Sequence, residues 1–371
     1  MGFEGRREAR SPGGSVKKPL PWRPRDWQRR PARSDEGAHQ IPMPTATIAN
    51  PPPRPVQGAG LIRSLPLGRK LHPLLGWING TSGLVSVPFG AGRLVHPASW
   101  TKAIATLLVV GEHLLPEFGL IAPILRSLKQ GTIVDVGANI GYFPLLIRRE
   151  SSLPILGFEP QPFLHELAST TVADSRLKDV ELRRLACGDA PGEVLFQSGP
   201  NGNIVSAAEA AATTAEHESA AASDLDTAAQ TTLKRRPIIP VPVVTLDTEL
   251  AHTRVSLMKI DCEGYELKIL QGAREILRRD RPVLLIEVHP QFLPQFGGSV
   301  RQVVEFLAPM YDLEAWDFSP DRGSLGLLRS LSRYAPDRGQ RFPDMETMIT
   351  AAATPPLPSQ LYLLCRPKGQ A

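Results

Sequence analysis

The stretch Thr132-Ile-Val-Asp-Val-Gly-Ala-Asn-Ile-Gly-Tyr-Phe143 determines the fold class that this sequence predicts. Its first five residues form a short run, rich in β-branched side chains, that is typical of a buried strand. Gly137 and Gly141 then allow the backbone to turn tightly and to approach a ligand. Residues 141–149 read as a helix, whose N-terminus presents unpaired N–H groups. The order of strand, glycine turn and helix therefore predicts a ligand-binding unit.

The same alternation continues along the chain. Further strands are expected at residues 155–158, 180–186, 255–260, 283–288, 311–316 and 361–365, and further helices at 163–172, 267–279 and 300–307. Ser299 can cap the last of these helices, and Pro282 is expected to end the one before it. Strands that alternate with helices predict a doubly wound α/β fold, with a mainly parallel sheet covered on both faces.

Composition divides the chain into regions. Residues 1–60 hold 11 prolines and few large apolar side chains, which predicts a disordered leader. An N-terminal extension is expected at 61–109, the α/β domain at 110–320, and a C-terminal segment with the last strand at 321–371. Residues 207–229 contain 11 alanines, so we expect a low-complexity insertion at about 204–236.

The net charge of +5 does not indicate a nucleic-acid partner. Residues 1–60 carry 11 Lys and Arg against 5 Asp and Glu, so the remaining chain is nearly neutral. It also lacks an uninterrupted run of roughly 18 apolar residues, so we expect no transmembrane segment. The three cysteines, Cys187, Cys262 and Cys365, are far apart in the sequence, which favours a reduced, cytoplasmic setting.

Polar side chains gather where the predicted strands end, which is the edge where open α/β sheets bind ligands. They are Asp135, Glu159, Asp261, Glu263, Glu287 and His289. Glu159 lies 22 residues after Gly137, where an acid can accept hydrogen bonds from both ribose hydroxyls of an adenosine. The sequence therefore predicts a nucleoside cofactor at this edge.

The glycine turn discriminates between two such cofactors. Dinucleotides usually require G-x-G-x-x-G, whereas this chain has D-x-G-x-x-x-G with Asp135 before the turn. An anion at that position disfavours a pyrophosphate but suits the ammonium group of S-adenosylmethionine. We therefore expect S-adenosylmethionine, and an NAD(P)-dependent oxidoreductase on a related fold is the alternative.

The second group of polar side chains suggests the chemistry. His289 has an unperturbed pKa near 6.5 and can act as a general base, as can Asp261, with Glu263 and Glu287 orienting an acceptor. Each acid can instead cap a helix, and His289 can be a structural histidine. These four residues also suit magnesium or manganese as ligands, but no compact spacing supports a metal, so we expect none.

Six segments, taken together, resemble the FkbM family of S-adenosylmethionine-dependent methyltransferases. They are residues 134–143, 158–160, 186–189, 244–247, 259–266 and 282–289, and they occur in the family's order. The resemblance implies a class I methyltransferase fold, which is Rossmann-like and has a seven-stranded sheet whose last strand is antiparallel.

The resemblance also implies a function and a set of site residues. It places Asp135, Gly137, Asn139 and Gly141 at the methionine end of the cofactor, Glu159 at its ribose, and Asp189 near its adenine. We expect methylation of a hydroxyl on a sugar, a glycolipid or a secondary metabolite. A non-catalytic interaction protein that retains the fold is the other alternative.

Overall fold

The structure is a computed structural model that describes residues 84–97, 100, 116–197, 203–205, 238–319 and 339–369. The leader predicted at 1–60, most of the predicted insertion and residues 320–338 lie outside the described residues. Among the helices in the described part of the chain, none combines the length and the apolar character that spanning a bilayer requires.

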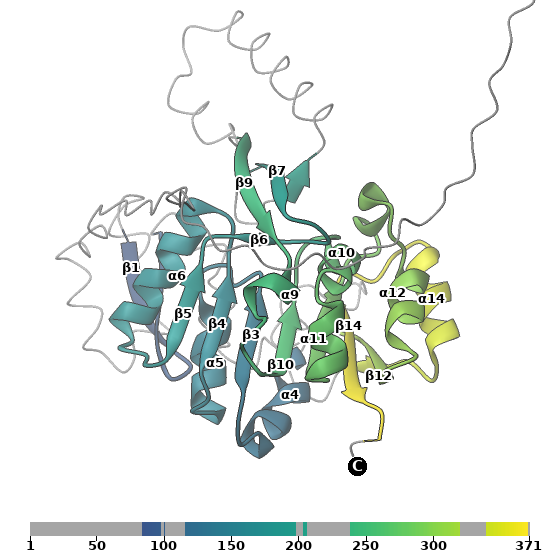
Figure 1. The fold of residues 1–371 in the computed structure, drawn as a ribbon, viewed down its shortest axis with the longest axis horizontal. Coiled ribbons are helices and arrows are strands. Elements are labelled where there is room, and N and C mark those ends of the chain that lie inside the picture. Colours follow the sequence, from purple (N-terminus) through teal and green to yellow (C-terminus); the bar gives the residue numbers. More distant parts are fainter. Residues whose placement is uncertain are drawn as a thin grey trace, which may run out of the picture. The chain divides into compact units, whose positions relative to one another are not determined.

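An eight-stranded sheet carries the α/β architecture (Figure 1). In spatial order its strands are β13 (Gln340–Arg341), β12 (Tyr311–Asp317), β14 (Leu361–Pro367), β11 (Val283–Val288), β10 (Val255–Ile260), β3 (Thr132–Val136), β4 (Ile155–Phe158) and β5 (Val180–Arg183). Neighbouring strands from β11 to β5 are parallel, and β14 runs antiparallel to both β11 and β12. The predicted mainly parallel sheet of seven strands with an antiparallel last strand is confirmed, and the two-residue β13 extends its edge.

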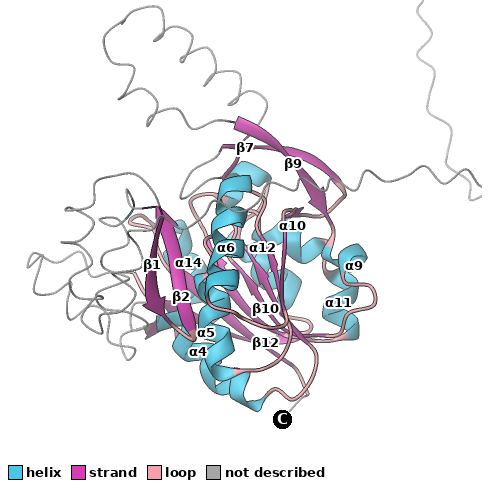
Figure 2. Cartoon of the chain, turned by 90° about the vertical axis from the view of Figure 1, so that its left-hand side faces the viewer, coloured by secondary structure: helices cyan, strands magenta, loops and turns pink. Residues whose placement is uncertain are grey.

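Helices cover both faces of this sheet, as the alternating pattern predicts (Figure 2). One face packs against α4 (Pro116–Ser127), α5 (Tyr142–Glu150) and α6 (Pro162–Asp174), and the other against α10 (Glu266–Gln271), α11 (Arg274–Arg279), α12 (Val300–Leu307) and α14 (Met345–Ala353). Successive strand residues point to opposite faces, so Ile133 lies in one hydrophobic cluster and Val134 in the other. Ser299 caps α12 as expected, its hydroxyl accepting a hydrogen bond from the Gln302 N–H.

A second sheet stands beyond the carboxyl ends of β4 and β10 (Figure 1). Its strands, in spatial order, are β6 (Ala186–Cys187), β9 (Ile238–Val244), β7 (Gly192–Gln197) and β8 (Asn203–Val205). The single strand expected at 180–186 is therefore wrong: β5 ends at Arg183, and Ala186 pairs with Val243 of β9. Arg183 and Arg184 interrupt the alternation of apolar and polar residues at this change of sheet, and the single-strand prediction overlooked that signal.

The helix expected at 267–279 is two helices, α10 and α11, divided at Gly272. A Cβ on Gly272 would collide with the Gly188 carbonyl oxygen, so the chain is held close to that backbone. The Asp247 carboxylate accepts hydrogen bonds from the N–H groups of Glu275 and Ile276, at 3.0 and 2.9 Å. Asp247, in the short helix α9 (Leu246–Glu249), thereby caps the start of α11.

A hairpin that the sequence pattern did not predict packs on the α5 and α6 side. Its strands are β1 (Leu84–Phe89) and β2 (Gly92–Pro97), which pair antiparallel. The Val95 N–H donates to the Thr171 hydroxyl of α6 at 3.0 Å, and the Ala91 N–H donates to the Leu145 carbonyl of α5 at 3.0 Å. The described part of the predicted N-terminal extension is thus bound to the α/β domain.

Candidate active site

A cavity of about 260 Å³ lies at the carboxyl ends of β3, β4, β10 and β11. Its polar lining comes from both groups of residues that the sequence singled out, namely Gly137, Asn139, Glu159, Asp261, Glu263, Glu287 and His289. Apolar side chains close other parts of the wall, including Phe196 and Ile204 of the second sheet and Phe296 of the 3₁₀ helix η3 (Leu293–Phe296). One cavity therefore joins three of the six predicted cofactor residues to the four predicted catalytic residues.

Glu159 follows β4 and is held by two backbone groups. The Asn139 N–H donates to Oε2 at 2.9 Å, and the Gln161 N–H donates to Oε1 at 3.0 Å. Burial raises the pKa of Glu159 to about 8, while these two hydrogen bonds oppose the increase. Each carboxylate oxygen keeps a second acceptor position, so the cavity contains a fixed acceptor for two hydroxyl groups.

The turn after β3 brings the backbone against the next strand. Gly137 has a φ of 86°, and a Cβ at this position would collide with the Asp261 carbonyl oxygen. Asn139 has a φ of 50°, in the left-handed region where asparagine is enriched. This turn therefore presents bare backbone to the cavity between the ends of β3 and β10.

A buried lysine links the two groups of acids. Lys259 and Asp135 are register partners on neighbouring strands, and the lysine Nζ lies 3.3 Å from Asp135 Oδ1 and 3.3 Å from Asp261 Oδ2. The Lys259 and Asp135 side chains are 3% and 0% exposed. Burial lowers the pKa of Lys259, but the charges of Asp135 and Asp261 outweigh burial and raise this pKa well above its ordinary value.

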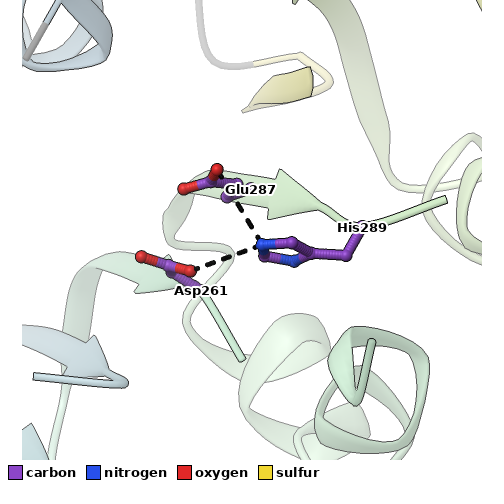
Figure 3. Close-up of side chains that lie close together, drawn as sticks. All are labelled: Asp261, Glu287 and His289. Atoms are coloured by element: carbon purple, nitrogen blue, oxygen red, sulfur yellow. Dashed lines mark ion pairs between the residues drawn. The ribbon is translucent and has the colours of Figure 1, made fainter. Parts of the chain in front are cut away.

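His289 lies among carboxylates at the end of β11 (Figure 3). Its Nδ1 lies 2.6 Å from Oε1 of the buried Glu266. Its Nε2 faces the cavity, 3.6 Å from Glu263 Oε2, 3.8 Å from Glu287 Oε1 and 3.9 Å from Asp261 Oδ1. Three strand-end carboxylates and one imidazole nitrogen therefore converge on one corner of the cavity.

The residues of this corner differ in their protonation at neutral pH. Burial lowers the pKa of His289, but the Glu266 hydrogen bond and the surrounding negative charges outweigh burial and raise the pKa to about 10. Burial and the Asp261 charge raise the pKa of Glu287 to about 8. At neutral pH His289 is therefore the positively charged imidazolium, with a proton on each ring nitrogen. A proton removed from a substrate would have to go to one of the carboxylates.

A further buried acid, Glu117 of α4, lies close enough to this region to sense the charges of Lys259 and Asp261. Burial raises the pKa of Glu117 to about 8, with Lys259 opposing and Asp261 reinforcing the increase. Between pH 4.5, the ordinary pKa of glutamate, and about pH 8, Glu117 binds a proton in the folded protein but not in the unfolded chain. Glu117 therefore makes folding stability fall as pH rises through that range.

We expect the Glu117→Gln variant to lose less stability than the wild type between pH 6 and pH 9. Glutamine has the shape of the protonated acid and no charge to desolvate, so the difference is expected to be on the order of 2 kcal/mol. Denaturant unfolding at both pH values measures it. Glu166→Gln, which changes an exposed acid on α6, serves as the control, and an equal fall in wild type and Glu117→Gln would contradict the assignment.

Three predicted cofactor residues are not part of the cavity lining. Asp135 is fully buried against Lys259, Gly141 is the N-cap of α5, and Asp189 pairs with Lys268 Nζ at 3.0 Å near the surface. Sequence reasoning also missed residues that shape the site. Lys259 is one of them, although a lysine inside an otherwise apolar strand is a signal that could have identified it.

The sheet order, with an antiparallel strand between β11 and β12, is that of the class I methyltransferase fold. The methyltransferase FkbM domain family matches residues 135–320, half of the chain. The chain therefore belongs to the FkbM methyltransferase family. Among curated proteins no match to the chain was found.

Solved structures resemble the chain only distantly. An FkbM methyltransferase from Methylobacillus flagellatus KT has 14% identity and a TM-score of 0.31, with 58% of this chain and 56% of that chain covered. An rRNA methylase from Streptococcus thermophilus has 11% identity and a TM-score of 0.33, with 67% and 94% covered. A precorrin-6y C5,15-methyltransferase from Geobacter metallireducens GS-15 has 10% identity and a TM-score of 0.32, with 68% and 88% covered.

Proposed function

We propose that the protein is an S-adenosylmethionine-dependent O-methyltransferase that acts on a hydroxyl of a sugar, a glycolipid or a secondary metabolite. The observation that carries the proposal is the single cavity that contains both Glu159 and the corner formed by Asp261, Glu287 and His289. Membership of the FkbM family supports methyl transfer, and the predicted cytoplasmic location stays a prediction. The nearly neutral chain beyond residue 60 favours a small-molecule or saccharide acceptor over a nucleic acid.

The residues on the β3 and β4 side fit S-adenosylmethionine. Glu159 offers two oriented oxygens to the ribose hydroxyls, and the bare backbone of Gly137 and Asn139 admits the methionine end. Asp135 does not line the cavity, and its buried carboxylate is paired with Lys259. When bound, the cofactor would supply a methyl group on a positively charged sulfur, which leaves as a neutral thioether when an acceptor oxygen bonds to the methyl carbon.

The residues on the β10 and β11 side fit an acceptor hydroxyl. A hydroxyl becomes an effective nucleophile as its proton leaves, so a proton acceptor must lie within reach. His289 is protonated at neutral pH, and we therefore assign the proton to the carboxylates of Asp261 and Glu263, with Glu287 and His289 orienting the acceptor. Holding oxygen, carbon and sulfur in line is the other contribution of the cavity walls.

Incubation with methyl-labelled S-adenosylmethionine and fractionated saccharides, glycolipids and small metabolites tests this function. We expect label in a hydroxyl-bearing fraction, in a form that resists mild alkali, as an ether does and a methyl ester does not. Asp261→Asn keeps the shape of the side chain but removes a proton acceptor, so we expect methyl transfer to fall roughly 100- to 10,000-fold.

The matched control is Asp312→Asn, which changes an exposed acid on β12 outside the cavity. Its transfer rate should equal that of the wild type. Equal rates in Asp261→Asn and the wild type would remove Asp261 from the mechanism. Purification of the protein with bound NAD(P), and without affinity for S-adenosylmethionine, would favour the oxidoreductase alternative.

A further inference from the structure

The corner formed by Asp261, Glu287 and His289 is organised by residues behind it. One polar atom of each side chain contacts an outer partner. Lys259 Nζ lies 3.3 Å from Asp261 Oδ2, and the Tyr362 hydroxyl donates to Glu287 Oε2 at 2.5 Å. Glu266 Oε1 lies 2.6 Å from His289 Nδ1. Such outer contacts fix the orientation of metal-ligating carboxylates and imidazoles in proteins. The second polar atom of each side chain is consequently directed toward the other two.

These three inward atoms are Asp261 Oδ1, Glu287 Oε1 and His289 Nε2 (Figure 3). Nε2 lies 3.9 Å from Oδ1 and 3.8 Å from Oε1, and one ligand atom from each residue lies within 4.8 Å of the others. Distances of 3.8–3.9 Å are too long for hydrogen bonds. The atoms therefore surround a small gap instead of bonding to one another.

The carboxylates around this gap favour a positive charge within it. His289 is 4% exposed, and within the described residues its Nε2 has carboxylate oxygens as neighbours but no hydrogen-bond partner. While the gap is empty, the protonated imidazole carries its second proton on Nε2; a cation that displaces this proton leaves Nδ1 donating to Glu266 and a lone pair of Nε2 directed toward two carboxylates. Either a proton on Nε2 or a cation in the gap compensates this concentration of negative charge.

We propose that Asp261, Glu287 and His289 bind a divalent cation of the Mn²⁺ type. Two carboxylates and one imidazole are a ligand set that Mn²⁺ accepts, because it combines oxygen ligands with nitrogen. Ligand atoms at about 2.2 Å from one ion are at most about 4.4 Å apart, so small side-chain movements close the present arrangement around a cation. The sequence did not predict this site because its ligands come from the ends of two strands, β10 and β11, and not from one compact motif.

The proposed role of the cation rests on the proposed function. Three protein ligands leave positions of a six-coordinate ion open toward the cavity, where water or oxygens of the acceptor can complete the sphere. A cation at this place orients an acceptor hydroxyl and makes its proton easier to remove. With Asp261 bound to the cation, Glu263 alone takes that proton, because its Oε2 lies 3.6 Å from Nε2 and it is the nearest carboxylate outside the three ligands.

Electron paramagnetic resonance of the full-length protein titrated with Mn²⁺ alone tests the site. We expect one saturable Mn²⁺ per chain, with a ¹⁴N coupling in the pulsed spectrum that shows an imidazole ligand. Glu287→Gln keeps the side-chain shape but removes a charged ligand, so Mn²⁺ should bind at least 10-fold more weakly. His289→Gln should also bind at least 10-fold more weakly and lose the ¹⁴N coupling.

Glu314→Gln on β12 is the control, since Glu314 pairs with Arg366 outside the cavity, and its Mn²⁺ affinity should equal that of the wild type. Absence of saturable Mn²⁺ binding to the wild type, or bound Mn²⁺ without ¹⁴N coupling, would overturn the proposal and favour a proton on Nε2. The wild-type spectrum gives this answer even if a variant fails to fold. Calorimetric titration with S-adenosylmethionine separates the two proposals, because its failure bears on the proposed function and not on Mn²⁺ binding.

Discussion

Glu159→Ala is expected to weaken S-adenosylmethionine binding roughly 100- to 1,000-fold, because it removes the acceptor of both ribose hydroxyls and each of the two lost hydrogen bonds costs about 1.5–2 kcal/mol. The substitution also leaves the N–H groups of Asn139 and Gln161 without their acceptor at the cavity wall. Isothermal titration calorimetry measures the change in affinity.

Glu166→Ala is the matched control, since it makes the same change at an exposed position of α6. Its affinity should equal that of the wild type, and thermal melting of both variants shows whether they fold. Unchanged affinity in a folded Glu159→Ala protein would mean that the ribose does not lie at the end of β4.

The second large effect concerns stability. We expect Lys259→Met to lower the free energy of unfolding by about 3–5 kcal/mol at pH 8, because it leaves the buried Asp135 without its counter-charge. Burial raises the pKa of Asp135 and Lys259 opposes the increase, so without Lys259 this carboxyl binds a proton more readily. The loss of stability should therefore be smaller at pH 5 than at pH 8, which denaturant unfolding at the two pH values measures.

Lys268→Met makes the same substitution in an exposed ion pair, because Lys268 and Asp189 are 30% and 38% exposed. Its cost should stay within about 1 kcal/mol at either pH. If the two variants lost equal stability, the proposed compensation of Asp135 by Lys259 would be refuted.

The sequence predicts the β3–α5 unit to within one residue because local chemistry specifies it. A run of β-branched residues favours a buried strand. Gly137 and Gly141 have φ values of 86° and 82°, which are turn conformations that other residues rarely adopt. Ser299 likewise marks the start of α12, since a hydroxyl at this position satisfies a free backbone N–H.

Features that depend on distant contacts were not predictable in the same way. The change of sheet after Arg183 depends on pairing of Ala186 with Val243, and the break at Gly272 depends on the approach of Gly188. The β1–β2 hairpin is fixed by contacts with α5 and α6 that its own sequence does not reveal. Contacts between residues far apart in the sequence thus determine where these elements begin, end and pair, and the local sequence pattern does not.

The candidate site was also predictable in part. Glu159, Asp261, Glu287 and His289 lie together at the strand ends as expected, because parallel strands bring their carboxyl ends to one edge. The outer partners Glu266 and Tyr362 were not predicted, since their roles depend on side-chain contacts across α10 and β14.

The second sheet has a consequence for how this architecture can diversify. Phe196 and Ile204 close the cavity from a segment that lies between β5 and β10 in the chain, whereas Glu159 and the glycine turn come from β3 and β4. One wall of the cavity is therefore encoded in a stretch of sequence separate from Glu159 and the glycine turn, which are the residues proposed to hold the cofactor. Substitutions at Phe196 and Ile204 can therefore reshape this wall of the cavity while Glu159 and the glycine turn stay unchanged.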